Sequence, residues 1–168
     1  YQQGSLGASG DLAPLAHLSL PLIGIGFVYY KKEKVEASYI LEKFNWEPLS
    51  LHSKEGLALL NGTQFSASYM AWCLLESKRL LRLANLTAAL SVDAFSCGFA
   101  PFDERLHKIR PHAGQQETAA AILHLLKDSE LSKSPKEFVQ DPYSFRCVPQ
   151  VHGASSDAIK YAEQVLLT

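Results

Sequence analysis

The spacing of apolar residues along the chain predicts a mainly helical protein. Residues 65–95 contain neither Gly nor Pro, and apolar side chains recur there at Met70, Leu74 and Leu81 with charged residues between them. This repeat is typical of one long amphipathic helix. Shorter segments with similar spacing predict further helices over residues 11–23, 37–44, 54–60, 115–126 and 155–167.

Strand-forming residues interrupt the helical pattern near the start of the chain. Residues 27–30 are aromatic or β-branched, residues 31–34 are charged, and the chain can return over residues 35–37. This order predicts a small β-hairpin. Because the pattern changes after Thr63, we expect two segments, 1–64 and 65–168. Gly, Pro and polar residues predict irregular chain over 98–112, 129–136 and 146–153.

Composition and charge exclude several classes of function. The chain has 168 residues, 47% of them hydrophobic, and a formal net charge of −1. It can therefore form a core, but it has no basic excess for binding nucleic acid. The longest apolar run, residues 18–30, contains Pro and Gly and is shorter than the roughly 20 residues of a membrane-spanning helix. We expect no nucleic-acid partner and no membrane partner.

The cysteines and histidines predict neither a disulfide framework nor a metal site. The three cysteines, Cys73, Cys97 and Cys147, are odd in number and far apart, which is typical of a reducing cytoplasm. The six histidines form no H-x-x-x-H or H-E-x-x-H pattern. The chain begins with Tyr1 and carries a dense motif at once, so we expect an internal piece of a longer protein.

That motif is the most informative stretch, and it reads Gly-Ser-Leu-Gly-Ala-Ser-Gly-Asp-Leu over residues 4–12. Its glycine spacing differs from the dinucleotide and phosphate-binding loops, and it does not match the G-x-S-x-G motif of hydrolases. Taken alone, it is a Gly-rich turn before the start of a helix.

Four blocks of sequence resemble the aromatic amino acid ammonia-lyases, and most closely the histidine ammonia-lyases among them. The first block contains Ala8-Ser9-Gly10-Asp11. The others are Lys54-Glu55-Gly56-Leu57-Ala58-Leu59-Leu60-Asn61-Gly62-Thr63-Gln64, Arg110-Pro111-His112-Ala113-Gly114-Gln115 and Gln140-Asp141-Pro142-Tyr143-Ser144-Phe145-Arg146-Cys147. Together they span most of the chain in the family's order.

The resemblance implies a prosthetic group made from the chain itself. In this family Ala-Ser-Gly cyclises into 4-methylideneimidazol-5-one (MIO), so Ala8, Ser9 and Gly10 are the expected precursors, and no dissociable cofactor is expected. Gly10 has no Cβ, which lets its nitrogen approach the Ala8 carbonyl, and Ser9 has a hydroxyl that can leave as water. The group serves as an electron sink for loss of ammonia. Two routes stay open, since either the substrate amine or its aromatic ring can add to the methylene.

The resemblance also assigns four residues outside the tripeptide. An Asn-Gly pair such as Asn61-Gly62 is by itself a helix C-cap, and the family match places Asn61 beside the prosthetic group. Tyr143 and Arg146 are three residues apart and would share a face of a helical turn. The family motif places Arg146 on the substrate carboxylate, Tyr143 near the electrophile and Gln140 in the pocket.

The fold implied is the mainly α ammonia-lyase fold, related to the aspartase and fumarase helical bundle, present here as a fragment with a small β-hairpin. Residues 1–64 would surround the prosthetic group, and residues 65–168 would start the central long-helix region. The expected reaction converts L-histidine to trans-urocanate and ammonia in cytoplasmic histidine catabolism, by a homotetramer. The family's usual catalytic base, a Tyr on a loop nearer the N-terminus, has no counterpart here, so the isolated fragment is expected to be inactive.

Two alternatives stay open. The first is a phenylalanine or tyrosine ammonia-lyase or an aminomutase, because the usual selectivity positions lie outside these residues. The second is a non-enzymatic helical assembly module, suggested by the long uninterrupted helix and by the incomplete set of catalytic residues.

Overall fold

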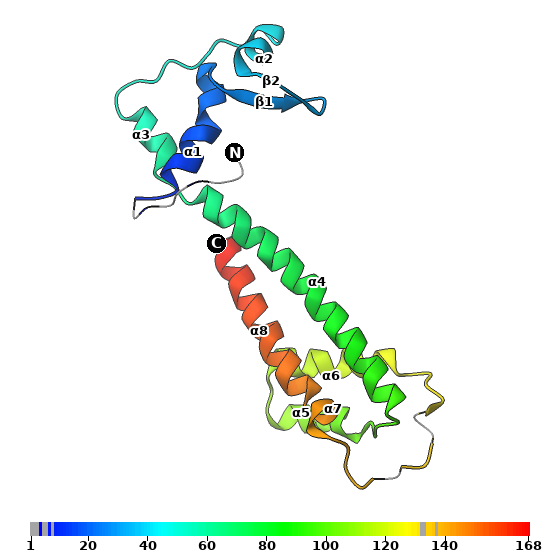
Figure 1. Cartoon of the computed structure of the whole chain (residues 1–168). Coiled ribbons are helices and arrows are strands. Elements are labelled where there is room, and N and C mark those ends of the chain that lie inside the picture. Colours follow the sequence, from blue (N-terminus) through cyan, green and yellow to red (C-terminus); the bar gives the residue numbers. More distant parts are fainter. Residues whose placement is uncertain (1–3, 5–6, 8, 132–133, 137) are drawn as a thin grey trace. The chain divides into compact units, whose positions relative to one another are not determined.

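The computed structural model describes residues 4, 7, 9–131, 134–136 and 138–168. The chain divides into two compact units, Tyr1–Met70 and Ala71–Thr168. Helices dominate both, and one two-stranded sheet is found among the described residues, so the predicted mainly α class with a small hairpin is confirmed (Figure 1).

The first unit starts with a helix and a hairpin. Helix α1 (Leu12–Ser19) continues as a 3₁₀ turn, η1 (Leu20–Ile23), which ends at Gly24 with a φ of 81°. The segment predicted as one helix over 11–23 is therefore α-helical at first and 3₁₀ at its end. Pro21, which has no N–H to donate, lies in the first turn of the 3₁₀ segment.

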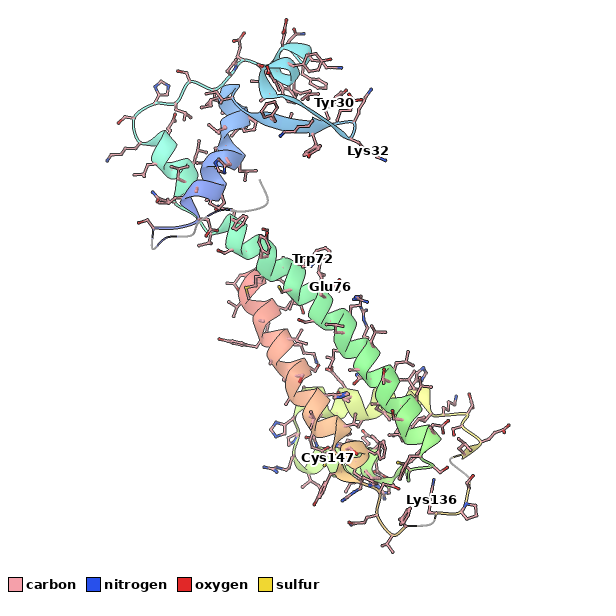
Figure 2. All side chains as sticks on the ribbon, viewed as in Figure 1. Tyr30, Lys32, Trp72, Glu76, Lys136 and Cys147 are labelled. Carbon is pink, nitrogen blue, oxygen red and sulfur yellow. The ribbon has the colours of Figure 1, made fainter. Side chains whose placement is uncertain are left out.

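The predicted hairpin is confirmed by an antiparallel pair in which Val28 lies opposite Val35. Both residues of its turn, Lys31 and Lys32, have positive φ, as the tight turns that match the twist of a hairpin require. Figure 2 shows Lys32 at the tip of the hairpin. The sheet and the two following helices are β1 (Phe27–Tyr30), β2 (Glu33–Glu36), α2 (Ala37–Lys43) and α3 (Glu55–Leu60).

The second unit contains most of the long helix that the sequence predicts. Helix α4 (Gln64–Ala94) runs without a break and ends where Ser96 adopts a φ of 52° and the Cys97 amide donates to the Val92 carbonyl. The remaining elements are η2 (Ala100–Phe102), α5 (Glu104–Ile109), α6 (Ala113–Leu125), α7 (Tyr143–Arg146) and α8 (Val148–Leu167).

Two predictions about this unit are wrong. Residues 98–112 were expected to form a loop, yet α5 forms there because the Asp103 side chain accepts from the Arg105 amide at its start. Helix α8 begins at Val148, so the irregular chain expected over 146–153 is largely helical and the start predicted at residue 155 lies inside α8. Pro149 lies in the first turn of α8, where a missing N–H costs nothing.

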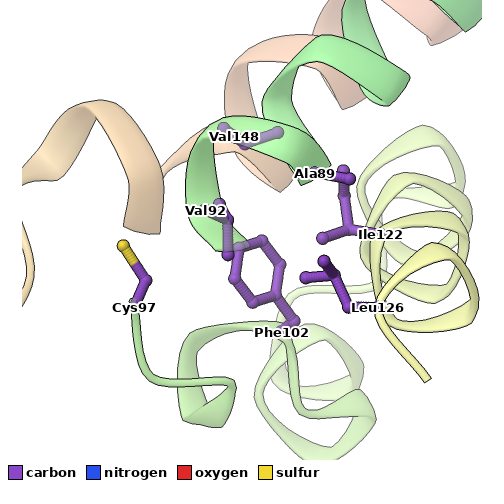
Figure 3. Packing of buried hydrophobic residues seen from close by; sticks show 7 residues of the cluster. All are labelled: Ala89, Val92, Cys97, Phe102, Ile122, Leu126 and Val148. Atoms are coloured by element: carbon purple, nitrogen blue, oxygen red, sulfur yellow. The ribbon is translucent and has the colours of Figure 1, made fainter. Parts of the chain in front are cut away.

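The core of the second unit lies between the end of α4, η2, α6 and the start of α8. Figure 3 shows Val92, Phe102 and Ile122 packed at its centre. Helices α6 and α8 cross closely, since a Cβ at Gly114 would lie 2.3 Å from the Gly153 carbonyl oxygen. Asp157 of α8 accepts from the Gly114 amide at 2.8 Å and so caps the start of α6.

Among the helices that the structure describes, none has the length and apolar character needed to cross a membrane.

Candidate functional site

The serine of the Ala-Ser-Gly tripeptide, Ser9, is exposed and lies in a tight turn just before α1. Two backbone hydrogen bonds of 3.3 Å close the turn, one from the Gly7 amide to the Gly10 carbonyl and one from the Gly10 amide to the Gly7 carbonyl. Ser9 is exposed between them. Ala8, the third expected precursor, lies outside the described residues.

Gly10 meets the end of α3 at backbone contact distance. Its φ is +114°, and a Cβ there would lie 2.8 Å from both the nitrogen and the oxygen of Gly62. Only glycine fits such a position without strain. The turn therefore fits the precursor of a cyclised tripeptide: its last residue has no side chain, and its serine hydroxyl is unobstructed.

Asp11 fixes this turn to the start of α4, and sequence reasoning missed that role. The side chain is 3% exposed, and its two oxygens accept from the amide and the hydroxyl of Ser66, each at 2.8 Å. The Asp11 amide donates to the Gly62 carbonyl at 2.8 Å. Asp11 thus acts as an N-cap for a helix that begins 53 positions later at Gln64.

Asn61 is the C-cap residue of α3, and its carbonyl carbon would lie 3.4 Å from a Cβ on Gly10. The backbone of Asn61 therefore lies next to Gly10, the last residue of the tripeptide. Helix α1 begins at Leu12, directly after the turn, so the helix N-terminus expected beside the tripeptide is present.

Tyr143 and Arg146 lie together in the second unit, on the single turn of α7. The guanidinium carbon of Arg146 is 4.5 Å from the centre of the Tyr143 ring, which confirms that the pair shares a face. Tyr143 is 72% exposed and Arg146 is half-buried. Gln140, also exposed, precedes α7 by three residues.

The predicted site residues thus form two groups, each within its own unit. The turn group contains Ser9, Gly10 and Asn61, and the α7 group contains Tyr143 and Arg146 with Gln140 ahead of them in the chain. In the described ranges, no group of three or more His, Cys, Asp or Glu side chains could hold a metal ion.

A pocket in the first unit is separate from the turn group. It encloses about 720 Å³, and its lining comes from α1, η1, β1 and the start of α4. The lining is mostly apolar and includes neither Ser9, Gly10 nor Asn61, so it lacks the groups that the predicted chemistry needs.

The thiol of Cys97 is expected to resist alkylation in the native protein. Burial raises the pKa of Cys97 to about 11, and the neighbouring negative charge of Asp141 adds to the increase. The thiolate is the reactive form, so at pH 8 iodoacetamide should modify Cys97 only after unfolding, and native modification should rise as the pH approaches 11. Peptide mass mapping with and without denaturant measures this. Rapid native modification at pH 8 would contradict the buried thiol.

Comparison with known proteins identifies the family. The profile described as "Aromatic amino acid lyase" matches residues 1–168. The chain belongs to the aromatic amino acid lyase family. This agrees with the resemblance carried by the four sequence blocks.

Two curated relatives in the aromatic amino acid lyase family are bacterial histidine ammonia-lyases. The chain is 48% identical to the one from Treponema denticola over 98% of its own length, and 46% identical to the one from Streptococcus pyogenes serotype M1 over 96%. In each case it spans 32% of the relative, so the chain covers about a third of a histidine ammonia-lyase.

Solved structures of the aromatic amino acid lyase family have the same fold. The phenylalanine aminomutase of Pantoea agglomerans matches with a TM-score of 0.83 and 33% identity, covering 98% of this chain and 35% of that one. Histidine ammonia-lyase from Trypanosoma cruzi matches with a TM-score of 0.77 and 36% identity, covering 95% and 30%. The ergothionase of Treponema denticola matches with a TM-score of 0.90 and 29% identity, covering 99% and 33%.

Proposed function

We propose that the chain is part of a longer enzyme that converts L-histidine to trans-urocanate and ammonia. The observation that carries the choice of substrate is the 48% identity to the Treponema denticola histidine ammonia-lyase over 98% of the chain. The identity is 33% to the phenylalanine aminomutase and 29% to the ergothionase, and both values are lower than this 48%.

In this proposal Ala8, Ser9 and Gly10 form the prosthetic group. A bond forms between the Gly10 nitrogen and the Ala8 carbonyl carbon, and the carbonyl oxygen leaves as water with the amide hydrogens of Gly10 and Ser9, so that a double bond joins the Ala8 carbon to the Ser9 nitrogen. Ser9 then loses its hydroxyl and its α-hydrogen as a second water. The exposed Ser9 and the close packing of Gly10 on Gly62 support this assignment, because a bulkier residue at position 10 would not fit. Once formed, the group supplies an electrophile that accepts electrons during loss of ammonia.

The rest of the turn group stabilises the tripeptide and the substrate amino group. Asn61, at the end of α3, has a side-chain amide that can both donate and accept hydrogen bonds. The N-terminal amides of α1, directly after Gly10, favour negative charge developing near the turn. The Asp11–Ser66 pair holds this geometry by anchoring the turn to α4.

Arg146 binds the substrate carboxylate in this proposal. A guanidinium offers a planar fork of donors that matches a carboxylate in two hydrogen bonds. Among the residues that the structure describes, no Asp or Glu forms an ion pair with Arg146, so its charge is available to a ligand. Tyr143, stacked on the guanidinium, keeps its hydroxyl group near the bound amino acid, and Gln140 contributes a further hydrogen bond.

We further propose a homotetramer in the cytoplasm. Large apolar side chains along α4 are exposed, which is unusual for a complete monomer. They include Trp72, Leu75, Leu80 and Leu90, which are between 56% and 65% exposed. Other copies and the remainder of the enzyme would cover this surface. The amino acid substrate is the only small-molecule partner proposed.

Incubating the complete enzyme separately with histidine, phenylalanine, tyrosine and ergothioneine tests the substrate. We expect urocanate absorbance to appear with histidine and no product of comparable rate from the others. Arg146→Ala should raise the KM for histidine by roughly 10- to 100-fold, the effect of losing a charged hydrogen-bonding partner. Arg146→Lys should recover part of the loss, because it keeps the charge but not the fork. Formation of cinnamate or coumarate without urocanate would contradict the histidine assignment.

A further inference from the structure

Asp141 lies between two predicted site residues, Gln140 and Tyr143, but has no assigned role. Its carboxylate Oδ2 accepts from the Gly98 amide at 2.7 Å, across 43 positions of sequence. Gly98 belongs to the short connection after the end of α4. The side chain of Asp141 therefore ties the segment before α7 to the end of the longest helix.

The main chain of the same residue holds Arg146. The Arg146 Nε donates to the Asp141 carbonyl oxygen at 2.6 Å, and the guanidinium stacks 4.5 Å from the centre of the Tyr143 ring. One donor of the guanidinium is thus used within the protein, and the two terminal nitrogens can still meet a carboxylate. Any movement of the Asp141 backbone would shift the Arg146 Nε and so rotate the two terminal nitrogens of the guanidinium.

Contacts around Asp141 restrict its movement. Cys97 is buried, the negative charge of the Asp141 carboxylate helps to raise the pKa of its thiol, and the Lys136 Nζ donates to the Cys97 carbonyl at 2.9 Å. The ring of Phe145 in α7 packs against that of Phe95, with 4.9 Å between the ring centres, so α7 also contacts the residue that follows α4. Figure 2 shows Lys136 in the loop ahead of α7 and Cys147 directly after it.

We propose that Asp141 is a positioning residue that sets the orientation of the Arg146 guanidinium toward the substrate carboxylate. The carboxylate of Asp141 fixes its own backbone to Gly98, and its carbonyl then fixes Arg146 Nε. This proposal rests on the proposed function, in which Arg146 binds the carboxylate. Asp141 itself touches no substrate.

The chain offers a matched control in Asp157. Its carboxylate also accepts from a glycine amide, that of Gly114, at 2.8 Å and also across 43 positions. Asp157→Ala therefore removes the same kind of hydrogen bond from the same unit without touching Arg146. A merely structural role of Asp141 would make the two alanine variants behave alike.

The test measures kcat and KM for histidine in the complete enzyme carrying Asp141→Ala, Asp141→Asn or Asp157→Ala. Asp141→Ala should raise KM roughly 10- to 100-fold with kcat within about threefold, the scale expected when a binding group is misplaced by about 1 Å. Asp141→Asn keeps an oxygen that accepts from Gly98 and should recover most of the loss. Asp157→Ala should leave KM unchanged. Inhibition by histamine, which lacks the carboxylate, should be the same in all variants.

A double-mutant comparison separates action through Arg146 from a direct effect. In an Arg146→Ala background, Asp141→Ala should change KM by less than about twofold, because the two residues act as one unit. An undiminished effect in that background, or an equal rise in KM for Asp157→Ala, would overturn the proposal.

A readout independent of catalysis distinguishes this proposal from the proposed function. Phenylglyoxal modifies arginine, and peptide mapping follows Arg146 alone. We expect Asp141→Ala, but not Asp157→Ala, to increase the modification rate of Arg146 several-fold. An unchanged rate overturns the positioning role, whether or not the enzyme deaminates histidine. Absence of lyase activity in the unsubstituted enzyme overturns the proposed function instead.

Discussion

Replacing Ser9 with alanine is expected to reduce histidine deamination by the complete enzyme about 10⁴-fold or more. That is the scale of loss when a group acting directly in the chemistry is removed. Alanine has no hydroxyl to lose as water, so the exocyclic methylene cannot form. The appearance of urocanate absorbance measures the rate, and the thermal midpoint should change little because Ser9 is exposed.

Ser68 provides the matched control for that substitution. It is another exposed serine of the first unit, and its hydroxyl donates to the Phe65 carbonyl at 2.7 Å within α4. Ser68→Ala should retain wild-type turnover. If Ser9→Ala retained turnover as well, the enzyme would not need the serine, and the proposed prosthetic group would be wrong.

Gly10→Ala is expected to prevent both the tight turn and the reaction that depends on it. At a φ of +114° an alanine Cβ would lie 2.8 Å from backbone atoms of Gly62, which cannot move aside as a flexible side chain can. We expect a loss of about 1–3 kcal/mol in the free energy of unfolding from backbone strain. Activity should fall to the level of the Ser9→Ala variant. Denaturant unfolding and the urocanate assay measure the two effects.

Gly7→Ala separates the crowding at Gly10 from a general effect of side chains in this turn. A Cβ at Gly7 would meet no atom within 4 Å, although the residue pairs with Gly10 through two backbone hydrogen bonds. We expect this variant to remain stable and active. Equal losses in both variants would show that the contact with Gly62 does not explain the requirement for glycine at position 10.

Local sequence patterns predicted most of the secondary structure. The long helix α4 and the hairpin follow from spacing and residue type over a few neighbouring positions, and both agree with the structure. The start of α8 was predicted too late, because residues 146–153 were expected to be irregular, whereas Pro149 is tolerated in the first turn of a helix. Helix α5 was missed because Gly98, Pro101 and the charged residues after them were taken to indicate a loop through His112.

The residues of the tripeptide and of the 140–147 block could be found from sequence because each motif is contiguous. Their anchors could not. Asp11 meets Ser66 across 55 positions and Asp141 meets Gly98 across 43, and one sequence carries no signal for such pairs. Gly62 was visible only as a helix C-cap, whereas its backbone packs against Gly10. These long-range contacts are set by how the helices pack.

The intact mass of the complete polypeptide tests the central claim most directly, which is that residues 8–10 become an internal electrophile. We predict a mass lower than that of the translated sequence by two molecules of water, with the whole deficit in the peptide that contains Ser9. A polypeptide with the full translated mass would contradict the account, whatever the quality of its fold.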